Sequence, residues 1–161
     1  MTKDNKDQDR KVITVNKKAR HDYFIQDTLE AGIVLQGTEV KSIREGRINL
    51  KDSYAKLEGD EIFLFNCHIS PYSKSALFNH DPLRKRKLLL KKRQIQKLIG
   101  KAIEKGQTVV PLKVYMKRNL VKVEIALALG KKLYDKRETL KRKEQDKQIA
   151  RVMKTSYRSS E

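Results

Sequence analysis

Residues 121–129 read VKVEIALAL, and this stretch gives the clearest strand pattern in the chain. Its odd-numbered residues are all large and aliphatic. Lys122 and Glu124 point the other way, and Ala126 and Ala128 continue that second face without bulk. A period of two predicts a β-strand with one buried face, and the small alanines predict that another backbone or a helix comes close to it.

Further strand patterns precede this one. Residues 109–116 form the strand before it, Lys117-Arg118-Asn119 fits a hairpin turn between the two, and Pro111 indicates an edge or a bulge. Short β-branched or aromatic runs predict the remaining strands at 12–15, at 23–35 as one long or bent strand, at 54–58, and at 62–65 after a turn at 58–61.

Two helices interrupt the strands, at 38–45 and, with an amphipathic stripe, at 92–105. Short strands with few helices predict a mainly β fold, a small closed β-barrel of the oligonucleotide-binding-like type with two or three helices and a basic C-terminal tail. We expect three parts: a disordered N-terminus at 1–10, a β-barrel domain at 11–130, and the tail at 131–161.

The composition points to an anionic partner. The 161 residues carry a net charge of +18, which is best explained by a polyanion, with nucleic acid as the leading class. A membrane is not favoured, because the chain has no long apolar span and its first ten residues, MTKDNKDQDR, do not resemble a signal peptide. A single cysteine, Cys67, excludes a disulfide framework and favours a reducing, cytoplasmic setting.

The tail has little to pack with. Residues 131–161 carry 11 Lys/Arg against 5 Asp/Glu, and residues 141–148 contain no apolar side chain. A helix of this kind is marginal in water by itself. We therefore expect a large anionic partner to supply the missing surface.

Charge is also clustered elsewhere. Residues 83–105 contain 10 Lys/Arg and one acid, and the three leucines at 88–90 lie between cationic runs, which suggests a rigid cation platform. Weaker clusters lie at 16–21 and 39–47. The alternative is solvated surface charge without a partner. Few aromatics and no RRM or KH signature favour shape and phosphate contacts to a folded RNA over base stacking.

The sequence contains no pattern of catalytic residues. Cys67 and His68 are neighbours in an expected strand, so their side chains should point to opposite faces. The three histidines and one cysteine have no metal-ligand spacing, and no glycine-rich loop cradles a phosphate. We expect a binding protein, not an enzyme, without metal or cofactor.

Four long blocks carry a family resemblance: residues 16–25, 30–44, 81–90 and 130–137. In this order they resemble the SsrA-binding protein family, also called small protein B, over roughly residues 12–153. The resemblance implies a barrel that binds transfer-messenger RNA, one monomer per RNA, and brings it to stalled bacterial ribosomes for trans-translation. From the residues alone, a general ribosome-associated structural RNA-binding protein remains the alternative.

Charge clusters and resemblance together give the predicted contacts with the tRNA-like domain. We expect Leu89 to act by packing, and Glu30 either to accept from a base or 2′-OH or, as we prefer, to orient a neighbouring Arg. The full predicted RNA-binding set is Asn16, Lys17, Arg20, His21, Glu30, Lys41, Ser42, Arg44, Arg84, Arg86, Lys87, Leu89, Lys91 and Lys92.

The resemblance also implies a role for the tail on the ribosome. Tyr134 stands where other members carry His, which preserves stacking but not a protonated ring. Beyond it, we expect a helix that forms in the empty message channel, with docking onto the barrel as the alternative. The residues predicted at the decoding centre and in the channel are Gly130, Lys131, Lys132, Tyr134, Asp135, Lys136, Arg137, Ile149, Val152 and Met153.

Overall fold

The computed structural model describes residues 10–75 and 77–158, without the side chains of 102–105, 133, 134, 136, 139 and 150–158. The elements along the chain are β1 (Arg10–Val15), α1 (Lys17–Asp22), β2 (Tyr23–Ile33), α2 (Gly37–Arg44), β3 (Ile48–Asn49), β4 (Tyr54–Glu58), β5 (Glu61–Phe65), β6 (His68–Ile69), β7 (Arg86–Leu89), α3 (Lys92–Lys105), β8 (Thr108–Lys117), β9 (Leu120–Gly130) and α4 (Leu133–Arg158).

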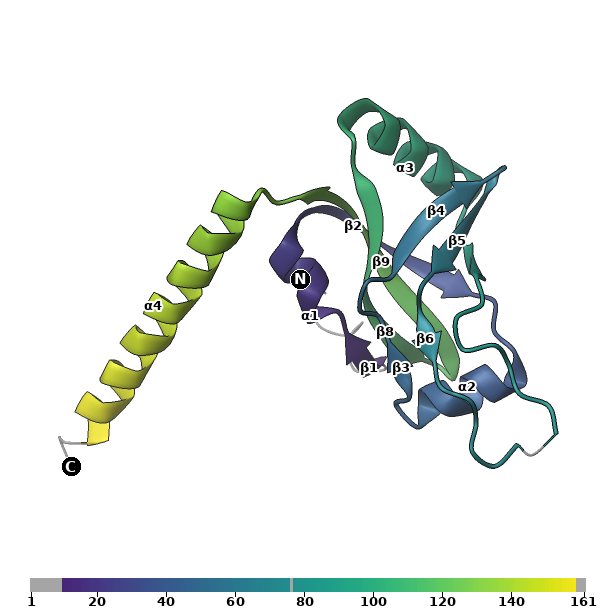
Figure 1. Ribbon diagram of the computed structural model, residues 1–161, viewed down its shortest axis with the longest axis horizontal. Helices are drawn as coiled ribbons and strands as arrows, with labels where there is room; N and C mark the ends of the chain where they lie inside the picture. Colours follow the sequence, from purple (N-terminus) through teal and green to yellow (C-terminus); the bar gives the residue numbers. More distant parts are fainter. Residues whose placement is uncertain (1–9, 76, 159–161) are drawn as a thin grey trace, which may run out of the picture. The chain divides into compact units, whose positions relative to one another are not determined.

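The larger sheet forms a ring of strands. Its order is β1-β8-β4-β5-β7-β2-β9, and β9 also pairs with β8, so that every strand except β1 belongs to a closed circle (Figure 1). All of these pairings are antiparallel, and β3 and β6 form a separate two-stranded sheet. The fold is mainly β with four helices in the described residues.

The stretch at 121–129 lies at the centre of the core. Val123, Ile125 and Leu127 are fully buried inside the ring, as the alternation predicts. The alanine face is covered by a helix, because Ala126 and Ala128 pack in one cluster with Ala19 of α1. The sequence shows α1 only as a basic cluster, since six residues are too few to display a helical period.

Two predicted turn features are confirmed. Arg118 and Asn119 connect β8 to β9 with φ angles of 47° and 63°, the conformation that suits a two-residue hairpin. In β8 the register shifts between Pro111 and Lys113, which is the bulge that the proline indicated.

Helices lie at both ends of the ring. Figure 1 shows α3 at one end and α2 at the other. Each contributes a buried side chain to the same core cluster, Leu98 from α3 and Ile43 from α2. Helices α2 and α3 therefore pack against the core inside the ring, whereas α1 covers part of its outer surface.

The chain divides into two compact units, Met1–Gly130 and Lys131–Glu161. The second consists mainly of α4. Residues 1–9 lie outside the described residues, so their disorder stays a prediction. Arg10, which the sequence analysis placed with them, is the first residue of β1 and pairs with Lys117.

Candidate nucleic-acid interface

The ring places β7, β2 and β9 side by side and so brings distant residues together. Gly32 of β2 is opposite Leu89 of β7 on one side and Lys122 of β9 on the other. A Cβ at position 32 would lie 3.1 Å from the Leu89 Cβ, so glycine permits this close approach. Leu89 still exposes 51% of its surface.

Glu30 lies two residues before Gly32, on the same face of β2. We call the group Glu30, Gly32, Leu89 and Lys122 the β2 face. The sequence analysis includes Glu30 and Leu89 among the contacts and misses Lys122. Alternation marks Lys122 as polar and outward, but only the strand register shows that it neighbours the other two.

Glu30 is surrounded by donors. The Tyr115 hydroxyl donates to it, Lys117 Nζ lies 3.4 Å from Oε1, and a guanidinium nitrogen of Arg10 lies 3.6 Å from Oε2. The Tyr115 hydrogen bond lowers the pKa of the Glu30 carboxyl, and Lys117 and Arg10 lower it further against a smaller opposing effect of burial. Glu30 is therefore ionised at neutral pH, beside an arginine of the kind predicted.

The predicted contacts on α1 divide into exposed and buried residues. Asn16 is 6% exposed and has a structural role that excludes a free RNA contact. Its side-chain oxygen accepts from the Ala19 N–H at the start of α1, and its amide donates to the Leu50 and Pro111 carbonyls. Lys17 and Arg20 are exposed. His21 is half-buried, and its Nδ1 lies 2.8 Å from Asp22 Oδ1.

Helix α2 shows a similar division. Ser42 is fully buried beside Ile43, so its predicted RNA contact is incorrect for this fold. Lys41 is exposed and lies with its Nζ 5.3 Å from the centre of the Tyr72 ring. Arg44 is exposed and, together with Lys11 and Arg118, lines an open hollow of about 610 Å³ without any acidic lining residue.

In the first part of the predicted cation platform, residues 84–87, the cations are paired with carboxylates of the protein. Arg86 is fully buried, with its Nε 2.7 Å from Glu39 Oε1, and its guanidinium also donates to the Cys67 and Pro82 carbonyls. Direct RNA contact by Arg86 is thus ruled out by the fold, because β7 alternates and this position faces inward with Leu88. Arg84 binds the same Glu39 with its Nη2 at 2.5 Å from Oε2.

The other two cations of this run also have carboxylate partners. Lys85 pairs with Glu58 and Lys87 with Glu61 on the neighbouring hairpin. Burial acts to raise the pKa of the Glu39 carboxyl, but hydrogen bonds from Arg84, the Gln36 N–H and Arg86 together lower it. Lys91 and Lys92, by contrast, are exposed just before and at the start of α3.

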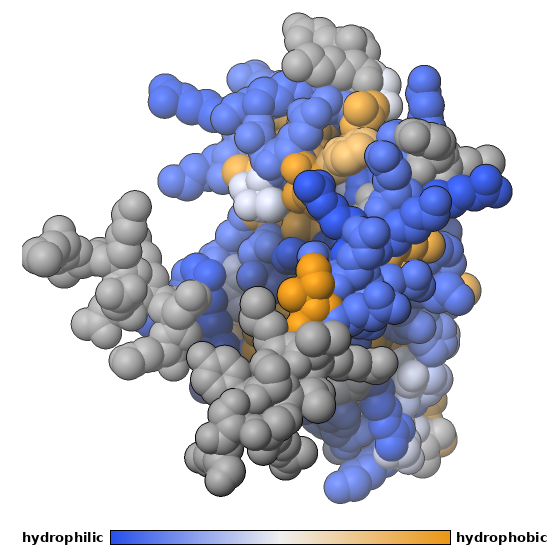
Figure 2. Space-filling view, turned by 90° about the vertical axis from the view of Figure 1, so that its left-hand side faces the viewer, coloured by the Kyte–Doolittle hydropathy of each residue, from blue (hydrophilic) through white to orange (hydrophobic). Residues whose placement is uncertain are grey.

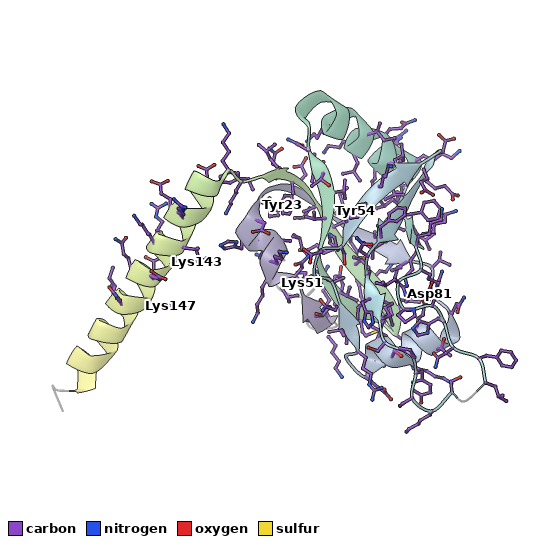
Figure 3. All side chains as sticks on the ribbon, in the orientation of Figure 1. Tyr23, Lys51, Tyr54, Asp81, Lys143 and Lys147 are labelled. Atoms are coloured by element: carbon purple, nitrogen blue, oxygen red, sulfur yellow. The ribbon has the colours of Figure 1, made fainter. Side chains whose placement is uncertain are left out.

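The second unit presents charge without a core. Residues 140–149 of α4 are all exposed, including Ile149 at 55%. Figure 3 shows Lys143 and Lys147 one turn apart on α4. Of the predicted decoding-centre residues, Gly130, Lys132 and Arg137 are exposed, and Lys131 and Asp135 are half-buried. The side chains of Tyr134, Lys136, Val152 and Met153 lie outside the described residues.

Catalytic and metal chemistry find no support in the described part of the chain. No group of three or more His, Cys, Asp or Glu there could hold a metal ion. Cys67 is buried, which raises the pKa of its thiol to about 11, while His68 is exposed as its strand position predicts. None of the described helices is both long and apolar enough to cross a membrane.

Figure 2 shows a mostly hydrophilic face with small hydrophobic patches.

Comparison with known proteins agrees with this geometry. A family model described as SmpB protein matches residues 13–155. An SsrA-binding protein of Enterococcus faecalis is 64% identical over 148 residues, which cover 92% of this chain and 96% of that relative. An SsrA-binding protein of Bacillus subtilis is 57% identical over 148 residues, covering 92% and 95%.

A solved structure gives the same result. A chain of the structure described as "tmRNA-SmpB: a journey to the center of the bacterial ribosome" matches with a TM-score of 0.64 and 50% sequence identity. The match covers 74% of this chain and 85% of that one. The family model, the two relatives and this structural match together establish that the chain belongs to the SmpB protein family.

Proposed function

We propose that this chain is an RNA-binding ribosome-rescue factor. It binds the tRNA-like domain of transfer-messenger RNA and delivers it to ribosomes stalled on broken messages, where trans-translation follows. The observation that carries the proposal is the near full-length match to relatives named SsrA-binding protein. The chain acts by binding, not as an enzyme, and its strand ring serves as an oligonucleotide-binding-like barrel.

The contacts with the tRNA-like domain lie on the first unit. The β2 face supplies a shaped surface with Leu89 and Lys122, and the exposed cations Lys17, Arg20 and Lys41 extend the positive surface. Phosphate contacts of this kind fix the register of a folded RNA, and shape provides the selectivity. Asn16 and Arg86 act inside the protein and hold these elements in place, and Ser42 is buried in α2.

The tail acts on the ribosome. Gly130 to Arg137 lies near the decoding centre, and Lys141 to Met153 lies in the empty message channel. The net charge of +6 over residues 131–161 and the exposed polar surface of α4 support this proposal, because a channel lined by RNA supplies the anionic surface. The division of the chain after Gly130 supports a tail that works separately from the RNA-binding unit.

A truncation after Gly130 tests both parts of the proposal. We expect the truncated chain to bind the tRNA-like domain nearly as tightly as the full chain, and to fail in tagging peptides on ribosomes stalled in vitro. An unrelated RNA hairpin of equal length is the binding control. Tagging by the truncated chain would refute the role of the tail, and equal affinity for the hairpin would refute selective binding of the tRNA-like domain.

A further inference from the structure

An acidic side chain on an RNA-binding surface requires an explanation. A carboxylate repels phosphates, so Glu30 lowers the attraction of the β2 face for RNA unless it does something else there. The contacts of Glu30 with β1 and β8 show what that is.

Tyr115 of β8 fixes the Glu30 side chain through a hydrogen bond. The tyrosine is 1% exposed, and its hydroxyl donates to a Glu30 oxygen. Burial raises the pKa of the Tyr115 hydroxyl, and the hydrogen bond to Glu30 raises it further. The hydroxyl is therefore protonated at neutral pH and donates to the carboxylate, which gives Glu30 a fixed anchor.

Two cations meet at the anchored carboxylate. Arg10 of β1 and Lys117 of β8 are direct partners in the strand register. Like charges placed opposite each other on neighbouring strands repel. Here the Glu30 carboxylate is within 3.6 Å of the Arg10 guanidinium and 3.4 Å of Lys117 Nζ. It offsets the repulsion, and the pair with Glu30 keeps a net charge of +1.

Both cations still reach solvent. Side-chain exposure is 28% for Arg10 and 35% for Lys117. The Arg10 guanidinium also lies 5.4 Å from the centre of the Tyr115 ring, which restricts its position further. Fixed, partly exposed cations are suited to phosphates, because little side-chain entropy is lost when the phosphates bind.

On the basis of the proposed function, we propose that Arg10 and Lys117 form a two-cation site for neighbouring phosphates of an RNA backbone, and that Glu30, anchored by Tyr115, is its positioning residue. Glu30 then acts on RNA through the two cations and not by direct contact. Both of its oxygens already accept hydrogen bonds from Tyr115 or Lys117, and Arg10 forms an ion pair with one of them.

A double-mutant cycle tests this arrangement in the full chain. Glu30→Gln is measured alone and in a background with Arg10→Gln and Lys117→Gln, by titration with the tRNA-like domain. We expect Glu30→Gln alone to weaken binding about tenfold, and to change it less than about twofold in the background. An equal loss in both would show that Glu30 contacts RNA directly and would overturn the proposal.

Two further measurements make the outcome specific. Arg10→Gln with Lys117→Gln should reduce the salt dependence of binding by about one unit of slope per lost phosphate contact. Lys51→Gln with Lys56→Gln, which removes two exposed lysines elsewhere on the same unit, is the charge-matched control. Tyr115→Phe keeps the ring and should weaken binding in the same direction as Glu30→Gln. Unchanged binding by a folded Tyr115→Phe, checked by circular dichroism, would contradict its role as anchor.

Repeating the cycle with an unrelated RNA hairpin separates this inference from the proposed function. Phosphates are common to both RNAs, so the coupling between Glu30 and the two cations should appear with either one. Equal affinity for the two RNAs, with the coupling still present, would refute the proposed function but support the two-cation site. If the effects of Glu30→Gln and of the two cation substitutions were additive with both RNAs, the two-cation site would be refuted, whereas the proposed function would stand.

Discussion

Arg86 and Leu89 stand close together on β7 and end in opposite surroundings. Arg86 is buried against Glu39, whereas Leu89 is half-exposed above Gly32. A buried charge needs a partner and further hydrogen bonds, and Arg86 has both in Glu39 and the surrounding carbonyls. The cation thus fixes β7 to α2, and the apolar residue remains available to an RNA.

Replacing Arg86 by Met should cost stability and leave RNA contacts intact. Removal of one partner from a buried ion pair typically costs roughly 3–5 kcal/mol, and the loss should appear as a lower urea midpoint. Lys85→Met is the control: its pair with Glu58 is exposed, so we expect a change below about 1 kcal/mol.

The salt dependence of RNA binding completes this prediction. The salt dependence should be unchanged by Arg86→Met, because the Arg86 side chain is not exposed to solvent. The titration is done under conditions in which the variant is still folded. A slope reduced by about one unit with normal stability would instead identify Arg86 as a phosphate contact.

At the scale of elements, the sequence predicts the helices and strands whose apolar residues recur with a clear helical or strand period. The strand at 121–129 and the helix at 92–105 are recovered, the helix with the same bounds. The helix α1 and the two-residue strands β3 and β6 are missed, and β7 is expected only as a strand or a turn around the three leucines at 88–90. α1 depends on Asn16, whose amide binds carbonyls of Leu50 and Pro111, and no local pattern reveals such distant partners.

The candidate site shows the same limit. Glu30 and Leu89 come from the resemblance, but their meeting with Lys122 follows from strand register. The run at 84–87 looks uniformly exposed as a list of charges. A strand alternates, however, so the cation two residues before the buried Leu88 shares its face and was a candidate for burial. The alternation of the strand therefore indicated a buried cation, which a count of charges along the run does not show.

The seam between β2 and β7 can be tested at Gly32. Gly32→Ala places a methyl group 3.1 Å from the Leu89 Cβ, and the half-exposed leucine should shift outward. We expect several-fold weaker binding of the tRNA-like domain, with a stability change within about 1 kcal/mol. Gly37→Ala, where nothing lies within 4 Å, is the control and should alter neither quantity by as much. A large loss of stability with normal binding would mean that Gly32 serves only the packing of the sheet.

At the scale of the whole molecule, the second unit carries more net positive charge per residue than the first. Residues 131–161 carry +6 of the total +18 on less than a fifth of the chain, with 11 Lys/Arg. Non-specific attraction to RNA depends on such clustered cations. The tail should therefore dominate weak binding to any RNA, and the first unit should determine the selective binding.

Titrations at several salt concentrations check this division. Removing residues 131–161 should reduce the salt slope for an unrelated RNA hairpin by several units and change the slope for the tRNA-like domain less. A full-length variant with Lys141→Gln, Lys143→Gln and Lys147→Gln should give an intermediate slope for the hairpin. Equal changes with both RNAs would show that the tail takes part in selective binding.

Closure of the ring also affects how copies of the protein behave toward each other in concentrated solution. Within the larger sheet of the described residues, β1 is the strand that pairs on one side only. A free strand edge can recruit another chain and start aggregation, and proteins commonly protect such edges with lysine and other charges. β1 begins with Arg10 and Lys11, so two copies approaching edge to edge would repel each other. The cationic start of this strand would thus preserve solubility as well as attract RNA.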